Sequence, residues 1–258
     1  MNLTVKLGGV AGAHAEALAV LADAATPDWV VVHGGGVEVA EWSRRLGLPP
    51  RVVDGLRVTD DATLDVVAAV LRGLVNARLV ARFNASGKRA LGISGTDGCL
   101  FSLVADEPLG FVGHVTAVDL ALLETLRAAG LIPIVAPLGS DERGQLLNVN
   151  ADEAAGAVAA ARGGRLLLLT DVPGVQHGGS LVPRLSIDAA ERMLAGGSAH
   201  GGMRPKLRAA IDAARAGCEV QILDGRSADD VRAALAGEAV GTQVMVEAGL
   251  ASAAGGSS

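Results

Sequence analysis

Short apolar runs that stop at glycine or polar residues alternate along this chain with longer segments whose apolar residues recur every three to four positions. The apolar runs lie at residues 3–7, 29–33, 89–93, 132–136, 165–170 and 219–224. Continuous apolar runs are typical of parallel strands that helices bury on both faces. The alternation therefore predicts an α/β sandwich with a mainly parallel sheet.

One internal segment departs from this pattern. Residues 95–118 contain shorter apolar pieces separated by glycine turns, which predicts a small antiparallel excursion from the main sheet that could serve as a lid. No repeat or linker divides the chain. We therefore expect a single domain over residues 1–250, with an N-terminal lobe to about residue 150, a C-terminal lobe from 151, and a disordered tail at 251–258.

The composition excludes several classes of protein. The formal net charge of −6 argues against nucleic-acid binding, which depends on neutralising phosphates with lysine and arginine. No apolar run approaches the length of about 18 residues that a membrane span needs, and the first residues do not resemble a signal peptide. These features predict a soluble cytoplasmic protein with no membrane partner. Cys99 and Cys218 lack metal-ligand spacing and are expected to be reduced and buried.

Two glycine clusters directly follow predicted strands. Gly8 and Gly9 occur in KLGGV, and Gly34, Gly35 and Gly36 occur in VHGGG, ahead of a predicted helix. Open α/β sheets bind ligands beyond the carboxyl ends of their strands. Glycine lets backbone N–H groups approach a ligand closely, and a helix N-terminus adds partial positive charge. The clusters therefore suit an anion such as phosphate, although tight turns alone would also explain them and neither matches GxGxxG or the P-loop.

Three basic residues stand in unusual positions. Lys6 lies within an apolar strand just before the first glycine turn, where it could reach a phosphate on those glycines, unless it is an edge-strand lysine facing water. Lys206 lies at the head of a predicted helix, where a cation is unfavourable unless it faces an anion. Arg57 stands between apolar neighbours and suits a carboxylate, which a guanidinium can bind with two hydrogen bonds. On this stretch alone, an arginine in a surface salt bridge is a fair alternative.

Polar residues alternate just before another predicted helix. Asn148, Asn150 and Asp152 are spaced by two, so in an extended segment they project to one side and could form the wall of a site. Asp152 could instead be only a helix cap. Further along, the strand at 165–170 ends at Asp171 and a Pro-Gly turn, at an edge where a nucleotide could bind.

The motifs VKLGG, VHGGG, GLRVTD, LNVNADEAA, LTDVPGV and GGMRPK, in this order over nearly the whole chain, resemble the amino acid kinase superfamily and, within it, the acetylglutamate kinase family. The resemblance implies an open, three-layer αβα sandwich with a central, mainly parallel sheet. It also implies ATP-dependent phosphorylation of the side-chain carboxylate of N-acetyl-L-glutamate to N-acetyl-L-glutamyl 5-phosphate, in arginine biosynthesis. Two positions depart from the family pattern: Val37 stands where proline is frequent, and some members carry an aspartate before the Gly-Met pair at Gly202.

The resemblance also implies a role for each matching residue. Lys6 and Lys206 would stabilise the transferring phosphoryl group, and Asp152 would orient both lysines. The residues implied to bind N-acetyl-L-glutamate are Gly35, Gly36, Arg57, Asn148 and Asn150. Those implied to bind ATP and its phosphates are Gly8, Gly9, Asp171, Val172, Pro173, Gly174, Val175, Gly201, Gly202 and Met203. Mg²⁺ would be bound mainly through the ATP phosphates, without a dedicated set of protein ligands.

The residues themselves agree with this chemistry. A carboxylate acceptor with a pKa near 4.3 is already ionised at pH 7, so its attack on ATP needs no general base. The transfer does need in-line positioning and neutralisation of the phosphoryl charge, which lysines, backbone N–H groups and Mg²⁺ provide.

Three alternatives remain open at this stage. A carrier-protein-linked 2-aminoadipate kinase of lysine biosynthesis usually has serine before the arginine that matches Arg57. A non-catalytic regulatory module would not need both lysines, and a dinucleotide-binding oxidoreductase would need fingerprint glycines that are missing. Arginine-inhibited members of the family carry an extra N-terminal helix that links dimers into hexamers. Since Lys6 lies five residues after Met1, we expect a homodimer that is insensitive to arginine.

Overall fold

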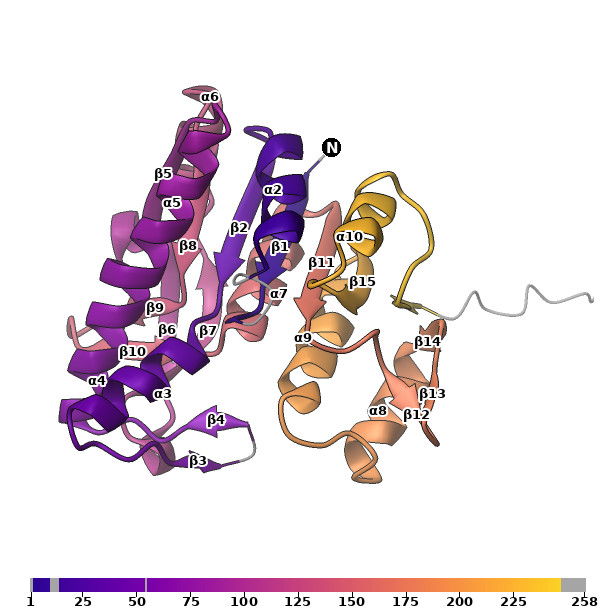
Figure 1. Ribbon diagram of the computed structural model, residues 1–258. Helices are drawn as coiled ribbons and strands as arrows, with labels where there is room; N and C mark the ends of the chain where they lie inside the picture. The colour runs from indigo at the N-terminus through magenta and orange to yellow at the C-terminus, as the bar shows by residue number, and fades with distance from the viewer. Residues whose placement is uncertain (1, 10–13, 54, 247–258) are drawn as a thin grey trace, which may run out of the picture.

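A continuous eight-stranded sheet forms the centre of the molecule (Figure 1). The computed structural model describes residues 2–9, 14–53 and 55–246. The strands lie in the order β14 (Arg184–Ser186), β16 (Thr242–Met245), β15 (Glu219–Asp224), β11 (Arg165–Thr170), β1 (Leu3–Leu7), β2 (Trp29–His33), β8 (Ile132–Ala136) and β5 (Ala90–Ser94). Every neighbouring pair is parallel except β15 and β16. The six predicted strands and the mainly parallel sheet are thus confirmed.

Helices cover both faces of this sheet and complete the three-layer αβα sandwich. On one face, α2 (Ala15–Ala24), α5 (Asn76–Ala85) and α10 (Ala228–Leu235) pack on Leu3, Val5 and Leu7 of β1 and their neighbours. On the other face lie α6 (Ala121–Ala128), α7 (Ala151–Arg162), α8 (Ile187–Ala195) and α9 (Met203–Arg215). Successive residues of a strand point to opposite faces, so Lys6 points toward the layer that contains α7 and α9.

A third, smaller core lies beside the sheet in the N-terminal half. It is formed by α3 (Gly36–Arg45), α4 (Asp61–Ala68) and the π-helical segment η1 (Ala69–Val75). A short hairpin of β3 (Val52–Val53) and β4 (Leu56–Arg57) connects α3 to α4. Apolar residues recur at helical spacing over residues 61–87, but this stretch forms three segments, because η1 interrupts the α-helical hydrogen bonding between α4 and α5.

The segment at residues 95–118 contains the predicted antiparallel pair, as β6 (Phe101–Ala105) and β7 (Val112–Val118). These strands close into a small barrel with β9 (Leu138–Ser140) and β10 (Leu146–Val149). Strands β9 and β10 are too short for an apolar pattern to reveal them. The remaining short elements are η2 (Asp97–Cys99), η3 (Glu107–Leu109), β12 (Gln176–His177) and β13 (Ser180–Leu181). The barrel leads through β10 directly into α7.

The strand order and the burial of the two cysteines decide further expectations from the sequence. Lys6 is not on an edge strand, because β1 lies between β11 and β2. Cys218 is buried as expected, but Cys99 is exposed, since it lies in the short surface turn η2 with a φ of 55°. Within the described part of the chain, no helix is both long and apolar enough to cross a bilayer. The tail at 251–258 lies outside the described residues.

Helices α7 and α9 pack directly against each other through Gly156. A Cβ atom at this position would lie 3.0 Å from both the Cβ atom and the carbonyl oxygen of Ala209. Such distances are shorter than normal van der Waals contact, so only glycine allows the two helices to approach this closely. The contact brings the helix that carries Asp152 against the helix that carries Lys206.

Replacing Gly156 by leucine is expected to lower the free energy of unfolding by about 1–3 kcal/mol, because the added side chain must push α9 away from α7. Ala161 lies on the exposed side of the same helix. Leucine at position 161 is therefore the matched control, with an expected change within about 0.5 kcal/mol. Urea denaturation followed by tryptophan fluorescence measures both values, and equal effects of the two variants would contradict the tight contact.

Candidate active site

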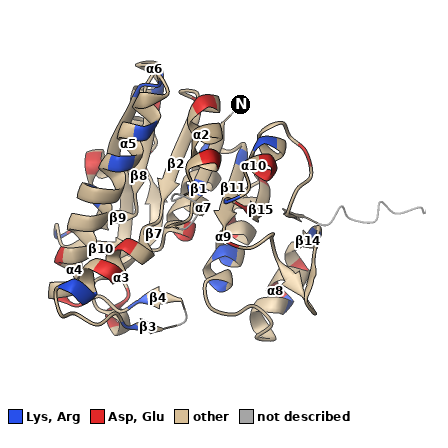
Figure 2. Cartoon of the chain, viewed as in Figure 1, with Lys and Arg blue, Asp and Glu red and all other residues tan. Residues whose placement is uncertain are grey.

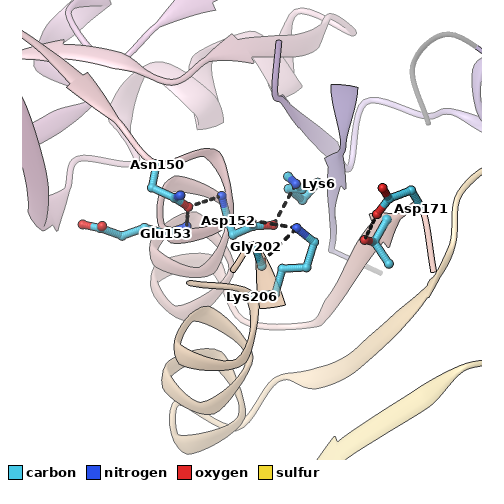
Figure 3. A network of polar contacts seen from close by, with 8 residues as sticks. Lys6, Asn150, Asp152, Glu153, Asp171, Gly202 and Lys206 are labelled. Atoms are coloured by element: carbon cyan, nitrogen blue, oxygen red, sulfur yellow. Dashed lines mark hydrogen bonds and ion pairs between the residues drawn. The ribbon is translucent and has the colours of Figure 1, made fainter. Parts of the chain in front are cut away.

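Two of the three lysines in the chain meet at a single buried carboxylate (Figure 3). The Lys6 ammonium, from β1, lies 2.8 Å from Oδ1 of Asp152. The Lys206 ammonium, from α9, lies 3.2 Å from Oδ2 and also contacts the carbonyl oxygen of Gly202 at 3.4 Å. The side chains are only 6%, 7% and 12% exposed for Lys6, Asp152 and Lys206. Two ammonium groups and one carboxylate leave a net positive charge, which suits a bound anion.

The ionisation of this cluster follows from burial and mutual attraction. Burial on its own raises the pKa of Asp152, but the two ammonium groups outweigh it and hold the pKa below its ordinary value. Burial lowers the pKa of Lys6, Asp152 opposes this shift, and Lys206 adds to it. The carboxylate is thus fixed in its charged form and keeps two like charges close together. The Asp152 side chain caps no helix end, since Asn150 is the N-cap of α7.

The two glycine turns lie next to each other, beside the ammonium group of Lys6. Gly8 donates its N–H to the carbonyl oxygen of Leu169 at 3.2 Å, and a Cβ atom there would lie 2.8 Å from that oxygen. A Cβ atom at Gly9 would lie 3.8 Å from the amide nitrogens of both Gly35 and Gly36. Gly35 and Gly36 begin α3, and the first N–H groups of a helix have no partner within it. These turns therefore offer backbone donors to an anion.

Arg57 approaches the second glycine turn from the β3–β4 hairpin. Its Nη2 donates to the carbonyl oxygen of Gly36 at 3.0 Å, whereas Nη1 is buried without a partner among the described residues. Burial, and then the nearby Arg44, lower the pKa of Arg57. A guanidinium with an unused donor in this position would gain from a carboxylate. The surface salt bridge considered from the sequence is absent from the described contacts of Arg57.

The two predicted asparagines lie beside the charged cluster. Asn148, on β10, donates to the hydroxyl of Thr59 at 3.2 Å. Asn150 accepts from the backbone N–H groups of Asp152 and Glu153 at 2.9 and 3.1 Å, which fixes the first turn of α7 (Figure 3). Asn150 therefore positions Asp152 as well as lining the site.

A cavity of about 280 Å³ unites these residues. Ten of the predicted site residues line it: Lys6, Gly9, Gly35, Gly36, Arg57, Asn148, Asn150, Asp152, Gly202 and Lys206. It opens at the carboxyl ends of β1 and β2, beside α3, the β3–β4 hairpin and the start of α9 (Figure 1). A larger cavity of about 360 Å³ lies along α7 and α9, but its described lining contains neither lysine.

Of the residues predicted to bind the nucleotide, Gly9 and Gly202 line this cavity, whereas Gly8, the stretch 171–175, Gly201 and Met203 are outside its lining. Strand β11 pairs with β1, so Asp171 follows the strand that neighbours Gly8. Asp171 and Pro173 are exposed, whereas the Val175 side chain is fully buried and its N–H donates to Thr242 at 2.8 Å. Gly201 is exposed and Met203 is partly buried at the start of α9.

Sequence reasoning missed several residues of the site. The apolar residues that line the cavity include Val67, Leu71, Val112 and Pro137, which come from four separate elements or loops. Glu153 anchors the start of α7 by accepting from the backbone N–H of Val115 at 2.7 Å. Nothing in their local sequence distinguishes these residues from ordinary core or helix positions.

Comparisons with known proteins agree with this geometry. A model of the amino acid kinase family matches residues 3–224. The acetylglutamate kinase of Methanopyrus kandleri is 47% identical over 234 residues, covering 85% of this chain and 93% of the relative. The acetylglutamate kinase of Rubrobacter xylanophilus is 46% identical over 254 residues, covering 97% of this chain and 99% of the relative.

Solved structures share the fold along nearly the whole chain. A crystal structure of a Streptococcus mutans protein has a TM-score of 0.82 at 26% identity, covering 95% of this chain and 98% of that one. N-acetylglutamate synthase of Neisseria gonorrhoeae, solved with coenzyme A and N-acetyl-glutamate, has a TM-score of 0.81 at 25% identity. The alignment covers 96% of this chain and 60% of that one. The extent of the family match, the identity to these relatives and the shared fold lead to one conclusion: the chain belongs to the amino acid kinase family.

Proposed function

We propose that this protein is an acetylglutamate kinase. It transfers the γ-phosphoryl group of ATP to the side-chain carboxylate of N-acetyl-L-glutamate and forms N-acetyl-L-glutamyl 5-phosphate, in arginine biosynthesis in the cytoplasm. The observation that carries the proposal is the convergence of Lys6 and Lys206 on Asp152 at the base of a cavity. The two curated relatives described above, each more than 45% identical, carry this name.

The charge balance of the site fits phosphoryl transfer to a carboxylate. The acceptor is already ionised at neutral pH, so the site needs no general base. What it needs is positive charge around the migrating phosphoryl group, and the two ammonium groups supply it in a desolvated setting where electrostatic stabilisation is strong. Asp152 keeps both ammonium groups at the same point, so that they need not rearrange during the reaction.

The acceptor would occupy the cavity on the side of Arg57. The unpartnered Nη1 of Arg57 suits the α-carboxylate of N-acetyl-L-glutamate, and the amide groups of Asn148 and Asn150 can hydrogen-bond its polar groups. Apolar side chains that line the cavity, among them Val67, Leu71, Val112 and Pro137, suit the acetyl methyl group. Residues to about 150 would thus contribute most of the acceptor site.

ATP would bind from the C-terminal half, over residues 151–250. Gly8 is hydrogen-bonded to β11, so phosphates on the first glycine turn would lie beside the stretch from Asp171 to Val175. Gly201, Gly202 and Met203 would approach from the start of α9. Val175 would contribute through the backbone, because its side chain is in the core.

Mg²⁺ would be held mainly by the ATP phosphates and by water. The buried carboxylate in the cavity, Asp152, is already paired with both lysines. When bound, the ion neutralises part of the phosphate charge.

The proposal predicts the substrate preference of the purified protein. With ATP and Mg²⁺, free N-acetyl-L-glutamate is expected to give an acyl phosphate, which hydroxylamine traps as a coloured hydroxamate. Carrier-protein-linked 2-aminoadipate, the substrate of the alternative kinase, is the comparison. Turnover of the carrier-linked substrate without turnover of N-acetyl-L-glutamate would reject the proposed function.

The Lys206→Ala variant is expected to lose kcat by about 100-fold or more, because it removes one of two cations that face the phosphoryl group. Lys88 is partly exposed, lies between α5 and β5 and does not line the cavity, so Lys88→Ala is the matched control and should retain the wild-type rate. Circular dichroism verifies that both variants are folded. A sensor without catalysis would show only weaker nucleotide binding in Lys206→Ala, and such a result would argue against the enzyme.

We also propose that the protein is a homodimer. Strand β5 forms one edge of the sheet, and Leu91 on this strand is 40% exposed. An uncovered edge strand with an exposed apolar side chain favours association with another chain. Sedimentation velocity is expected to give twice the chain mass of 25.8 kDa. A monomer or a hexamer would contradict the proposal.

A further inference from the structure

We propose that His33 is a positioning residue that fixes the Gly34–Gly35 peptide, so that the amide hydrogen of Gly35 faces the anion in the cavity. The inference rests on the kinase function proposed above, because it assigns to that amide a part in holding the transferring phosphoryl group. In this role His33 acts through the peptide, and its imidazole does not contact the reacting groups.

The hydrogen bonds around Gly34 define the orientation of this peptide. His33 is the last residue of β2 and is 1% exposed, and its Nδ1 lies 2.7 Å from the carbonyl oxygen of Gly34. Gly34 donates its own N–H to the carbonyl oxygen of Leu7 at 2.8 Å. In a planar trans peptide the C=O and N–H groups point in opposite directions. A carbonyl of Gly34 held toward His33 therefore turns the N–H of Gly35 away from it.

The other side of this peptide is where the cavity lies. Gly35 lines the cavity together with Lys6 and Gly9. The amide nitrogens of Gly35 and Gly36 are equally distant, at 3.8 Å, from the place of a Cβ atom at Gly9. The turned N–H group of Gly35 thus faces the space between the two glycine turns.

The tautomer of His33 is fixed by a second buried side chain. The amide nitrogen of Asn76 lies 3.1 Å from Nε2 of His33 and also donates to the carbonyl oxygen of Ile134 at 2.8 Å. An amide nitrogen can only donate, so Nε2 must accept and the hydrogen resides on Nδ1. Burial lowers the pKa of His33 to about 4, with the Gly34 contact opposing and Arg72 adding to the shift. The imidazole is therefore neutral at pH 7 and donates to Gly34.

The chain provides space and support for Asn76 from several elements. A Cβ atom at Gly92 on β5 would lie 1.9 Å from Oδ1 of Asn76, so only glycine allows the amide to fit. Arg72, in the π-helical segment η1, donates to the same oxygen at 3.4 Å and lies 3.6 Å from Asp97. Segment η1 ends directly before Asn76, and π-helical segments occur frequently at functional sites.

The need for such support follows from the glycines themselves. Gly34, Gly35 and Gly36 are three consecutive residues with the greatest backbone freedom, and a catalytic amide is useful only if its direction is fixed before the reaction. The turn carries no side chains that could hold it. His33 and Arg57 instead fix the carbonyl oxygens of Gly34 and Gly36 from outside.

Two substitutions separate the two hydrogen bonds of His33. In His33→Asn, the side-chain amide nitrogen takes nearly the place of Nδ1 and can still donate to Gly34. In His33→Gln, the side-chain amide reaches the place of Nε2 and can still pair with Asn76, but it leaves the Gly34 carbonyl without its donor. The kcat of each folded variant is measured with N-acetyl-L-glutamate and ATP, next to the wild-type enzyme.

The expected result is a loss of kcat in His33→Gln of up to about 100-fold, with little change in KM, and a loss in His33→Asn that is at least about tenfold smaller. A histidine that serves only the core would lower stability in both variants and leave kcat per folded molecule equal. That result would overturn the inference. An inactive wild-type enzyme would instead reject the proposed function.

Crystal structures of both variants test the inference independently of any measurement of enzyme activity. We expect the Gly34–Gly35 peptide to keep its orientation in His33→Asn and to rotate in His33→Gln. An unchanged peptide in His33→Gln would overturn the inference even if the enzyme is an acetylglutamate kinase.

The pH dependence of stability checks the neutral imidazole. The unfolded chain protonates His33 near pH 6.5 and the folded chain only near 4, so the free energy of unfolding should fall as the pH decreases from about 6.5 to about 4. This part of the decrease should vanish in both variants. Glu38 and Arg78, which line another cavity of about 250 Å³ together with His33, and Arg72, whose charge lowers the pKa of His33, are kept in both variants. A decrease that persists in the variants would contradict a neutral, buried His33.

Discussion

The ion pair of Asp152 with two lysines is the interaction on which the rest of the site depends. Removing Asp152 would leave two buried ammonium groups without a counter-charge, and the loss of one partner from a buried ion pair typically costs about 3–5 kcal/mol. The convergence of the three groups depends on three elements: β1 carries Lys6, the first turn of α7 carries Asp152, and the first turn of α9 carries Lys206. The close packing of α7 on α9 at Gly156 is the structural condition for it.

The site combines fixed charges with backbone donors that need external support. The lysines provide charge on the side of α7 and α9, while the glycine turns provide N–H groups at the ends of β1 and β2. Glycine permits close approach to a ligand but does not define a direction, and His33 and Arg57 supply the missing constraint through the carbonyl oxygens. Both residues lie just outside the glycines whose orientation they determine.

The fold alone does not identify this chemistry. One architecture can carry many unrelated reactions, so the reaction must be argued from the residues of the site. Figure 2 shows acidic and basic residues interspersed over the helices, without a gathering of basic residues in that view. The few charged groups that are buried, rather than the many at the surface, therefore indicate the function.

The sequence by itself determined the six main strands, the covering helices and the motifs of the site, because buried parallel strands are continuously apolar and glycine turns are conspicuous at their ends. It could not decide whether Lys6 was exposed at an edge, whether Asp152 was a cap, or that 61–87 contains a π-helical segment. Those outcomes depend on the order of strands and on contacts between residues such as Lys6 and Asp152, 146 positions apart. Only the tertiary structure decided them, since local pattern encodes burial and periodicity but not which distant groups meet. The same holds for His33, which looks like one more strand residue until the fold brings Asn76 against it.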